Sequence, residues 1–453
     1  MQSKANDLQP RLGFFPIYNI VVANIIGAGI FTTSGILMGN LGNVGYLLML
    51  WFAGGIVALC GALSYSELGI AMPRAGGEYT FLSQLFGPPL GFLSGWVSFI
   101  AGFSAPIAAS AIGFGEYFYR AMPEGYALLP GMNISEMTIK KVLAISVIFL
   151  FTFIHARGVS MGAKIQNWLT IMKIGLLVLL VIFGLWLGKG NWQHFSFSNT
   201  LTPKSFGGIS TLGLGLLWVM FAYSGWNAAT YIGSEVKNPR INLPRALIGG
   251  TLTVMVLYLA LNIFFIYAIP PNEMAGVVSV AGLAVKLAFG LNTEMVVSLL
   301  ISFALFSSLS AYLILGPRVY YAMASDGLLF RSLAHVSKSS GVPSRAIFLQ
   351  GIISAVMVIS GTFEQILTYM GVALGLFPIV AVWGIFRLRK LHPEAVRMPG
   401  FPLVQIIFLS ASIGMLTLSL KERPVESAIA IATVLAGVPV YYFFRTKYRR
   451  DAP

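Results

Sequence analysis

Charged residues are scarce in this sequence. Asp, Glu, Lys and Arg make up 10% of its 453 residues, whereas soluble proteins carry about 25%. Hydrophobic residues make up 57%. So few charges cannot cover the surface of a globular protein in water, which excludes the soluble classes. The sequence therefore predicts an integral membrane protein.

Cysteine and histidine are scarce as well. Cys60 is the only cysteine, so the chain cannot form an internal disulfide, and a metal site built from thiolates is improbable. None of the histidines, His155, His194, His335 and His392, falls near the middle of an apolar run, and no metal-binding or phosphate-binding motif is present. We therefore predict no enzymatic activity, no cofactor and no metal site.

Long apolar runs dominate the rest of the chain. A transmembrane helix needs about 20 apolar residues, and the polar start, MQSKANDLQPRLG, lacks the cleavage site of a removable signal peptide. We therefore expect an all-α fold in which the first apolar run stays as a helix. The sequence predicts twelve transmembrane helices, at residues 14–38, 44–70, 85–119, 138–155, 161–188, 208–235, 245–269, 293–325, 344–360, 364–389, 401–420 and 425–444.

Positive charge is distributed unevenly over this predicted topology. If the N-terminus is cytoplasmic, most of the 29 Lys and Arg residues lie on the cytoplasmic side, as the positive-inside rule requires. The same placement accounts for the net charge of +14, which indicates orientation and attraction to anionic lipid rather than nucleic-acid binding. We expect a multi-pass protein of the cell membrane, inner or plasma, with both termini in the cytoplasm.

Two apolar runs contain glycines that would interrupt a helix. The first run carries NIIGAGIF at Asn24–Phe31, and the sixth carries FAYSGWN at Phe221–Asn227. An interrupted helix exposes N–H groups on one half and carbonyl groups on the other. Paired interruptions in two inverted repeats are typical of transporter binding sites, and such a pair of ends suits a zwitterion. The alternative is that these glycines only permit close helix packing.

One basic residue, Lys173, falls inside an apolar run. It lies about 16 Å along the fifth predicted helix at 1.5 Å per residue, close to half the thickness of a bilayer core, about 15 Å. Its ammonium group must then find carbonyl or hydroxyl oxygens or a water-filled cavity within the protein, which indicates a functional residue. The alternative is a different helix frame, in which Lys173 lies nearer the interface.

Four motifs resemble a known family of transporters. They are NIIGAGIF in the first helix, LSYSELGIAMPRAGGEYTFL after the second, FAYSGWNAATYIGSEVKNPRINLPRAL across the sixth and GPRVYYAMASDGLL after the eighth. Together they are similar to the amino acid-polyamine-organocation family, in particular to its bacterial amino-acid permeases and L-type amino-acid exchangers.

The resemblance implies a LeuT-type fold within one transmembrane domain, residues 1–453. This fold is an inverted repeat of five plus five helices, in which helices 1 and 6 are broken. The first repeat would occupy residues 12–205 and the second residues 206–390, followed by helices 11 and 12 at residues 400–445.

The resemblance also assigns roles at the two interruptions. The substrate carboxylate would contact backbone around Gly27, Ala28 and Gly29, and the ammonium would contact carbonyl groups on both broken helices. Many members carry serine in place of Ala28, so a hydroxyl contact is missing here. The expected substrate-binding residues are Asn24, Ile25, Ile26, Gly27, Ala28, Gly29, Phe221 (also the aromatic gate), Ala222, Ser224 and Gly225.

Lys173 takes the place of a bound cation in this resemblance. In sodium-driven relatives a cation sits between helices 1 and 8, near helix 5, and in several sodium-independent members a lysine of helix 5 reaches that place. The resemblance implies that Lys173 does the same here, with Ser307 and Ser308 of helix 8 as hydroxyl partners.

The predicted function is sodium-independent secondary transport of L-amino acids by alternating access, through exchange or through facilitated or proton-coupled uptake. Neutral substrates are expected, because Lys173 would repel a cationic side chain and no Asp or Glu lies mid-membrane in the predicted topology. Two alternatives stay open: a transporter of cationic amino acids or polyamines, and an amino-acid sensor or receptor. The expected partners are the amino-acid substrate and membrane lipid, and the sequence assigns no partner subunit.

Two acidic residues fall near the predicted cytoplasmic face. Glu67 and Glu235 could form ion pairs with Arg74 or Arg318 there and hold an inward gate closed. The alternative is that these are solvated loop charges, whose pairs contribute only about 0–1 kcal/mol.

Overall fold

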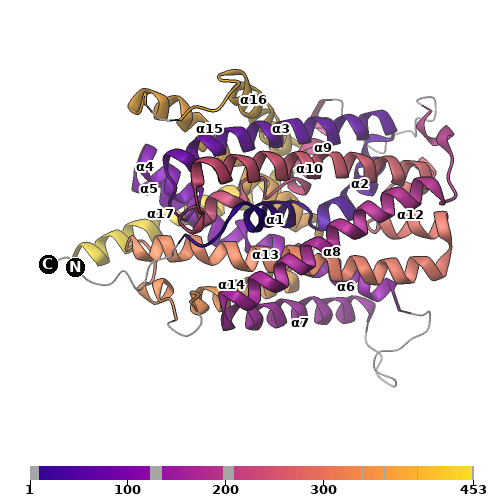
Figure 1. Ribbon diagram of the computed structural model, residues 1–453, viewed down its shortest axis with the longest axis horizontal. Helices are drawn as coiled ribbons and strands as arrows, with labels where there is room; N and C mark the ends of the chain where they lie inside the picture. Colours follow the sequence, from indigo (N-terminus) through magenta and orange to yellow (C-terminus); the bar gives the residue numbers. More distant parts are fainter. Residues whose placement is uncertain are drawn as a thin grey trace.

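The computed structural model describes residues 10–122, 135–196, 209–337, 341–361, 363–394 and 396–450, which fold almost entirely into helices (Figure 1). Of the shorter elements, η2 is a π-helix, and η3, η4 and η5 are 3-10 helices. The elements are α1 Phe14–Ile25, α2 Ala28–Leu41, α3 Val44–Ala71, α4 Glu78–Phe86, α5 Pro88–Val97, η2 Ser98–Gly102, α6 Ser104–Arg120, α7 Glu136–Arg157, α8 Val159–Trp186, η3 Trp192–Phe195, α9 Ile209–Ala222, η4 Ala228–Glu235, α10 Pro239–Ala268, α11 Pro271–Met274, α12 Val280–Phe289, α13 Leu291–Ser325, η5 Arg331–Ala334, α14 Ser344–Ser360, α15 Phe363–Leu391, α16 Leu403–Glu422 and α17 Pro424–Arg450.

Ten helices of the described chain are long and apolar enough to cross a membrane. Two of the twelve predicted spans, at residues 208–235 and 344–360, correspond instead to shorter apolar helices, Ser210–Ala222 and Ser344–Ser360. The protein is therefore a multi-pass membrane protein, as its composition predicts, and the count of twelve spans stays a prediction.

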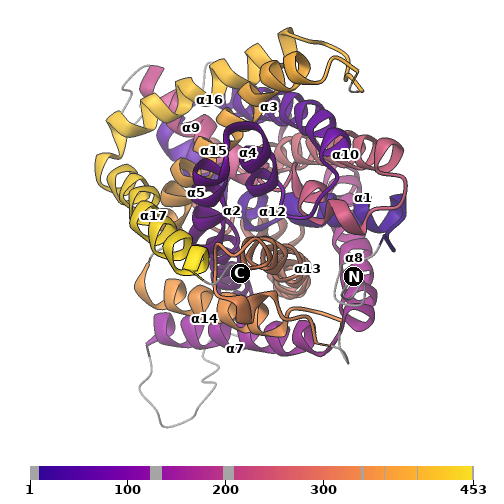
Figure 2. The same cartoon turned by 90° about the vertical axis from the view of Figure 1, so that its left-hand side faces the viewer.

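The helices form one bundle with α2 in its centre, and α1 runs inward from the edge (Figure 2). α1 packs against α8, α10 and α13, and α2 packs against α9 and α12. In contrast, α7, α8, α16 and α17 lie at the periphery and expose large apolar side chains such as Trp168, Leu435 and Phe443. Apolar side chains at the periphery suit contact with lipid tails, while the two glycine-containing stretches are enclosed by protein.

The chain before α1 is joined to the end of η4 by backbone hydrogen bonds. The N–H groups of Arg11 and Leu12 donate to the carbonyl of Glu235 at 2.9 and 2.8 Å, and the N–H of Lys237 donates to the carbonyl of Leu12 at 2.8 Å. Leu12 and Val236 form an isolated parallel β-bridge. The start of α1 is thus fastened to η4. It lies at the same end of the molecule as α4 and the end of α17, called the termini end below (Figure 1).

Ion pairs connect segments at the termini end. Nε of Arg318 lies 3.1 Å from Oε1 of Glu235, and both side chains are buried. This pair is one of those that the sequence suggested. Arg74 pairs instead with Asp326 at 2.6 Å, with the arginine half exposed.

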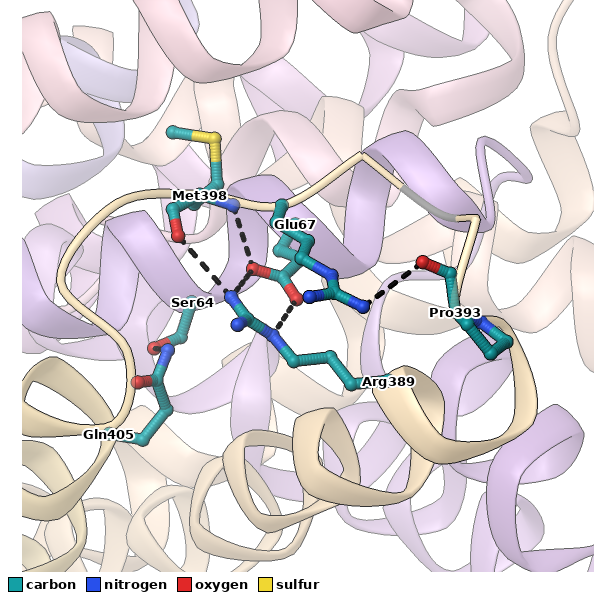
Figure 3. A network of polar contacts seen from close by, with 7 residues as sticks. Ser64, Glu67, Arg389, Pro393, Met398 and Gln405 are labelled. Atoms are coloured by element: carbon teal, nitrogen blue, oxygen red, sulfur yellow. Dashed lines mark hydrogen bonds and ion pairs between the residues drawn. The ribbon is translucent and has the colours of Figure 1, made fainter.

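Glu67 lies at the centre of a network of polar contacts between α3 and α15 (Figure 3). Its carboxylate is 1% exposed and accepts hydrogen bonds from Nε and Nη2 of Arg389 at 2.7 and 2.8 Å and from the N–H of Met398 at 2.9 Å. The guanidinium of Arg389 also lies 3.9 Å from the ring centre of Phe401. The suggested pairing of Glu67 with either of two other arginines is therefore wrong, because α15 brings Arg389 onto it.

We predict that Arg389→Met strongly destabilises the protein, because it leaves the buried Glu67 carboxylate without its counter-ion. Breaking a buried pair costs about 3–5 kcal/mol. Thermal unfolding of the detergent-solubilised protein would measure the effect as a lower midpoint. Arg397→Met is the control, since Arg397 is exposed and donates only to the carbonyl of Pro393 at 3.1 Å. Equal midpoints for both variants would contradict the prediction.

Candidate functional site

α1 and α2 follow each other with a short interruption between them. α1 ends at Ile25 and α2 begins at Ala28. Between them, Ile26 donates its N–H to the carbonyl of Val22 at 2.9 Å, and Gly27 is extended, with φ −113° and ψ −158°. Gly27, the N-cap residue of α2, has no side chain and makes no capping hydrogen bond. The first N–H groups of α2 therefore face the interruption without a partner from the cap residue.

A second interruption separates α9 from η4. α9 ends at Ala222, and η4 begins at Ala228. Within the turn, the N–H of Ser224 donates to the carbonyl of Phe221 at 2.9 Å, and Gly225 has a φ of +102°. Glycine adopts this conformation freely, whereas other residues are strained there. The turn of FAYSGWN therefore depends on its glycine.

The two interruptions pack directly against each other. A Cβ atom at Gly29 would lie 2.6 Å from Cα and Cβ of Ala222, and a Cβ atom at Gly225 would lie 2.7 Å from Cβ of Asn24. Both separations are too short for carbon atoms that are not bonded, which prefer about 3.5–4.0 Å. The glycines therefore permit close packing, the alternative raised by the sequence, at the same places where the helices are interrupted.

Lys173 reaches the carbonyl end of α1 from α8. The side chain is fully buried, and Nζ donates to the carbonyls of Ala23 at 3.2 Å and Ile26 at 2.5 Å and to Oγ of Ser308 at 2.7 Å. The Ser308 hydroxyl itself donates to the Ile26 carbonyl at 2.6 Å. An ammonium group has three donors, so these three oxygens account for all of them.

Two tyrosines satisfy the carbonyls between those that Lys173 contacts. The hydroxyl oxygen of Tyr312 in α13 lies 2.9 Å from the carbonyl oxygen of Asn24. The hydroxyl oxygen of Tyr258 in α10 lies 2.7 Å from the carbonyl oxygen of Ile25 and 3.0 Å from that of Ala222. Tyr258 is therefore bound to both interruptions at once.

Ser307 lies beside this cluster but bonds elsewhere. Its Oγ is 3.1 Å from Oγ1 of Thr170 and 3.3 Å from Nε2 of Gln166. Successive residues of a helix point about 100° apart, so only one of the two serines can face Lys173. The structure gives that contact to Ser308.

Two cavities adjoin the interruptions. The smaller has a volume of about 10 Å³ and the larger about 100 Å³, and Phe221, Ser224 and Tyr312 line both. Of the expected substrate-binding residues, only Ile26 lines neither cavity. The smaller is lined by Ile25, Gly27, Ala28, Gly29, Phe221, Ala222 and Ser224, and the larger by Asn24, Phe221, Ser224 and Gly225.

Glu78, the first residue of α4, lies in the wall of the larger cavity. The carboxylate is buried and accepts hydrogen bonds from the hydroxyl of Tyr65 at 2.8 Å, from Nδ2 of Asn227 at 2.7 Å and from the hydroxyl of Tyr231. Burial raises the pKa of Glu78 above its ordinary value, and the three hydrogen bonds to its charged form oppose this rise. Glu78 therefore lines the same cavity as Phe221.

Sequence reasoning missed Tyr258, Tyr312 and Glu78. The two tyrosines stand inside predicted spans, where a buried hydroxyl needs a partner, and that signal was available. Glu78 follows a glycine pair, Gly76 and Gly77, both with positive φ. These glycines turn the chain, so a segment that reads as a loop places its carboxylate in the bundle.

Comparison with known families agrees with this geometry. Residues 12–439 match the model of a family described as amino acid permease. The chain belongs to this family. It is therefore an amino-acid transporter, and the resemblance carried by its four motifs is confirmed.

Individual relatives are similar to this amino acid permease over almost its whole length. The b(0,+)-type amino acid transporter 1 of Mus musculus is 30% identical over 97% of this chain and 89% of the relative. The serine/threonine exchanger SteT of Bacillus subtilis (strain 168) is 29% identical over 98% of both. The human cystine/glutamate transporter is 29% identical over 94% of this chain and 83% of the relative. Relatives with different named substrates are thus about equally similar.

We predict that Tyr258→Phe slows amino-acid exchange about tenfold, because a buried carbonyl left without its donor costs about 1–3 kcal/mol. Exchange of labelled amino acid in proteoliposomes would measure the rate. Tyr223→Phe is a matched control: the ring of Tyr223 packs beside that of Tyr258, but its hydroxyl donates to the carbonyl of Trp51 at 3.1 Å and not to α1. If the two variants slowed exchange equally, the special role of Tyr258 would be refuted.

Proposed function

We propose that this amino-acid transporter carries neutral L-amino acids across the cell membrane by alternating access, without sodium. One observation carries the proposal: the uncapped N-terminus of α2 and the end of α9 border the same small cavity. N–H groups at a helix N-terminus attract a carboxylate, and carbonyls at a helix C-terminus attract an ammonium group. Every amino acid carries both charges.

The carboxylate would bind the backbone N–H groups around Gly27, Ala28 and Gly29. Ala28 offers no hydroxyl, but Ser110 of α6 lines the same cavity and supplies one nearby. The ammonium would bind the carbonyls of Phe221 and Ala222. Each of these already accepts one hydrogen bond, and a carbonyl oxygen has a second lone pair for the substrate.

Lys173 supports sodium independence. Its ammonium group lies among three oxygens between α1, α8 and α13, where it supplies the positive charge that a bound cation would otherwise supply. The positive charge of Lys173 would repel a metal ion bound to the same oxygens. We therefore assign Lys173, with Ser308, the role of holding α1 in place during transport.

The position of Phe221 is consistent with a gate between the two cavities. Its side chain is buried and borders both of them. Alternating access requires a group that covers the substrate from one side and then moves. Phe221 stands where such a cover would separate the small cavity from the larger one.

The side-chain class of the substrate is inferred from the wall of the larger cavity. Neutral side chains suit the apolar residues Met220, Phe221 and Met370 in the wall of the larger cavity. Transport of cationic amino acids is the second candidate, and Glu78 is the observation that favours it, since this carboxylate lies in the same wall. The names of the relatives cover several substrate classes.

The arrangement of the chain in the membrane is part of the proposal. The excess of Lys and Arg favours a cytoplasmic location for both termini and for the termini end of the bundle. The two glycine-containing interruptions support inverted repeats at residues 12–205 and 206–390. Partners beyond the amino acid and membrane lipid are not assigned.

We predict counterflow of labelled amino acid into proteoliposomes preloaded with the same unlabelled amino acid, at equal rates in sodium and choline buffers. A panel of all twenty L-amino acids as competitors would rank the substrates, with neutral ones displacing best. A requirement for sodium would overturn the coupling proposal. Binding of an amino acid without uptake or exchange would favour a receptor instead.

We predict that Lys173→Ala reduces this counterflow at least about tenfold, because charged hydrogen bonds of about 1.5–3 kcal/mol are lost at the end of α1. Thr170→Val, one turn earlier on α8, removes a buried hydroxyl that contacts Gln166 and Ser307 but not α1, and should keep most of the activity. Both variants should insert into the membrane normally. Wild-type rates in Lys173→Ala would show that the lysine has no role in transport.

A further inference from the structure

The larger cavity carries a single charged side chain. Among the described residues that line it, Glu78 is the only Asp, Glu, Lys or Arg, and no histidine is present. The remaining wall is apolar, aromatic or neutral and polar. The described wall of the cavity therefore holds one acidic side chain and no basic one.

Glu78 differs from the other deeply buried carboxylates of the described chain. Glu67, Glu235 and Glu294 each pair with an arginine. Glu78 is 4% exposed, and no Lys, Arg or His within the described ranges lies within ion-pair distance of it. Its three donors, Tyr65, Asn227 and Tyr231, are all neutral groups.

Burying a carboxylate without a counter-ion costs free energy, and an ionisable group inside a membrane bundle points to a functional site. The three neutral donors fix the direction of the carboxyl group and favour its charged form against the effect of burial, but they supply no counter-charge. A charge of this kind inside a transport cavity acts on whatever enters. Its effect depends on the sign of the charge that the entering molecule carries.

A second acceptor faces the same cavity. Asn24 is 1% exposed, and its Nδ2 donates to the carbonyl of Ile20 at 2.9 Å. Its Oδ1 is buried and has no hydrogen-bond partner in the described part of the chain. Asn24 and Glu78 both line the cavity, so a residue with an unpaired amide oxygen and an acidic residue lie in the same wall.

We propose that Glu78 sets the charge selectivity of the larger cavity, so that neutral and cationic amino acids pass and acidic amino acids are excluded. This inference rests on the proposed transport function and goes beyond it by naming the residue that sorts substrates by charge. A side-chain carboxylate entering the cavity meets a like charge in surroundings of low dielectric constant, where repulsion is strong.

A cationic side chain meets the opposite situation. It gains Glu78 as a counter-ion and the aromatic rings of Phe103, Phe221 and Trp226 in the same wall, and an aromatic face attracts a cation. A neutral side chain is affected little by the charge. The substrates expected to separate most clearly are therefore pairs of equal size that differ only in charge.

The experiment uses competition against counterflow in proteoliposomes. The label is the neutral amino acid that the wild-type protein exchanges fastest among the twenty. The competitors are L-glutamate and L-glutamine, which have nearly the same shape, and L-lysine and L-norleucine. In the wild-type protein, L-glutamine should compete at least about tenfold better than L-glutamate, the discrimination expected of a like charge nearby.

Glu78→Gln removes the charge and keeps the size. It should improve competition by L-glutamate about tenfold and weaken that of L-lysine by a similar factor, with smaller changes for L-glutamine and L-norleucine. Glu78→Asp retains the charge and should keep the wild-type order. Glu116→Gln is a control for a lost carboxylate elsewhere, since Glu116 pairs with Lys140 at 2.7 Å and lines neither cavity.

Two results would overturn the inference. One is a wild-type protein that accepts L-glutamate as well as L-glutamine, a result that stands even if Glu78→Gln fails to fold. The other is a folded Glu78→Gln protein that keeps the wild-type order of competitors, which would reduce Glu78 to a structural link between α3, α4 and η4. Failure of the transport proposal looks different, because then no amino acid exchanges in the wild-type protein.

Discussion

The last carbonyl groups of α1 have no partner within their own helix, and the bundle depends on side chains that come from elsewhere to satisfy them. Lys173, Tyr258, Tyr312 and Ser308 do so from α8, α10 and α13. An unsatisfied carbonyl in the membrane interior costs several kcal/mol. These contacts therefore determine where α1 ends and hold its end against three helices at once.

The close contact between the two interruptions limits what fits between them. The smaller cavity, about 10 Å³, has room for roughly one water molecule, and Gly29 already touches Ala222. An amino acid is much larger, so the binding proposed at the helix ends requires movement. Phe221 borders both cavities, and displacing its ring would join the small space to the larger one.

Local sequence signals predicted the parts of the molecule that depend on local physics. Apolar runs of membrane length predicted helices, and the depth of Lys173 predicted that oxygens must surround it. Local signals could not predict contacts between segments that are distant in the sequence, such as the pair of Glu67 and Arg389, which are 322 positions apart. Which of Ser307 and Ser308 contacts Lys173 depends on how α13 is oriented about its own axis, and the structure was needed to show this. The position of Glu78 depends on the turn that brings α4 into the bundle.

The backbone hydrogen bonds between Leu12 and the end of η4 couple the movement of α1 to that of η4. Both flank the larger cavity, α1 through Asn24 and η4 through Tyr231. If α1 tilts outward, either η4 travels with it or the hydrogen bonds at Glu235 and Lys237 break together. We therefore expect opening at the termini end to have a threshold, which favours a closed or an open pathway over a half-open one that would leak small solutes.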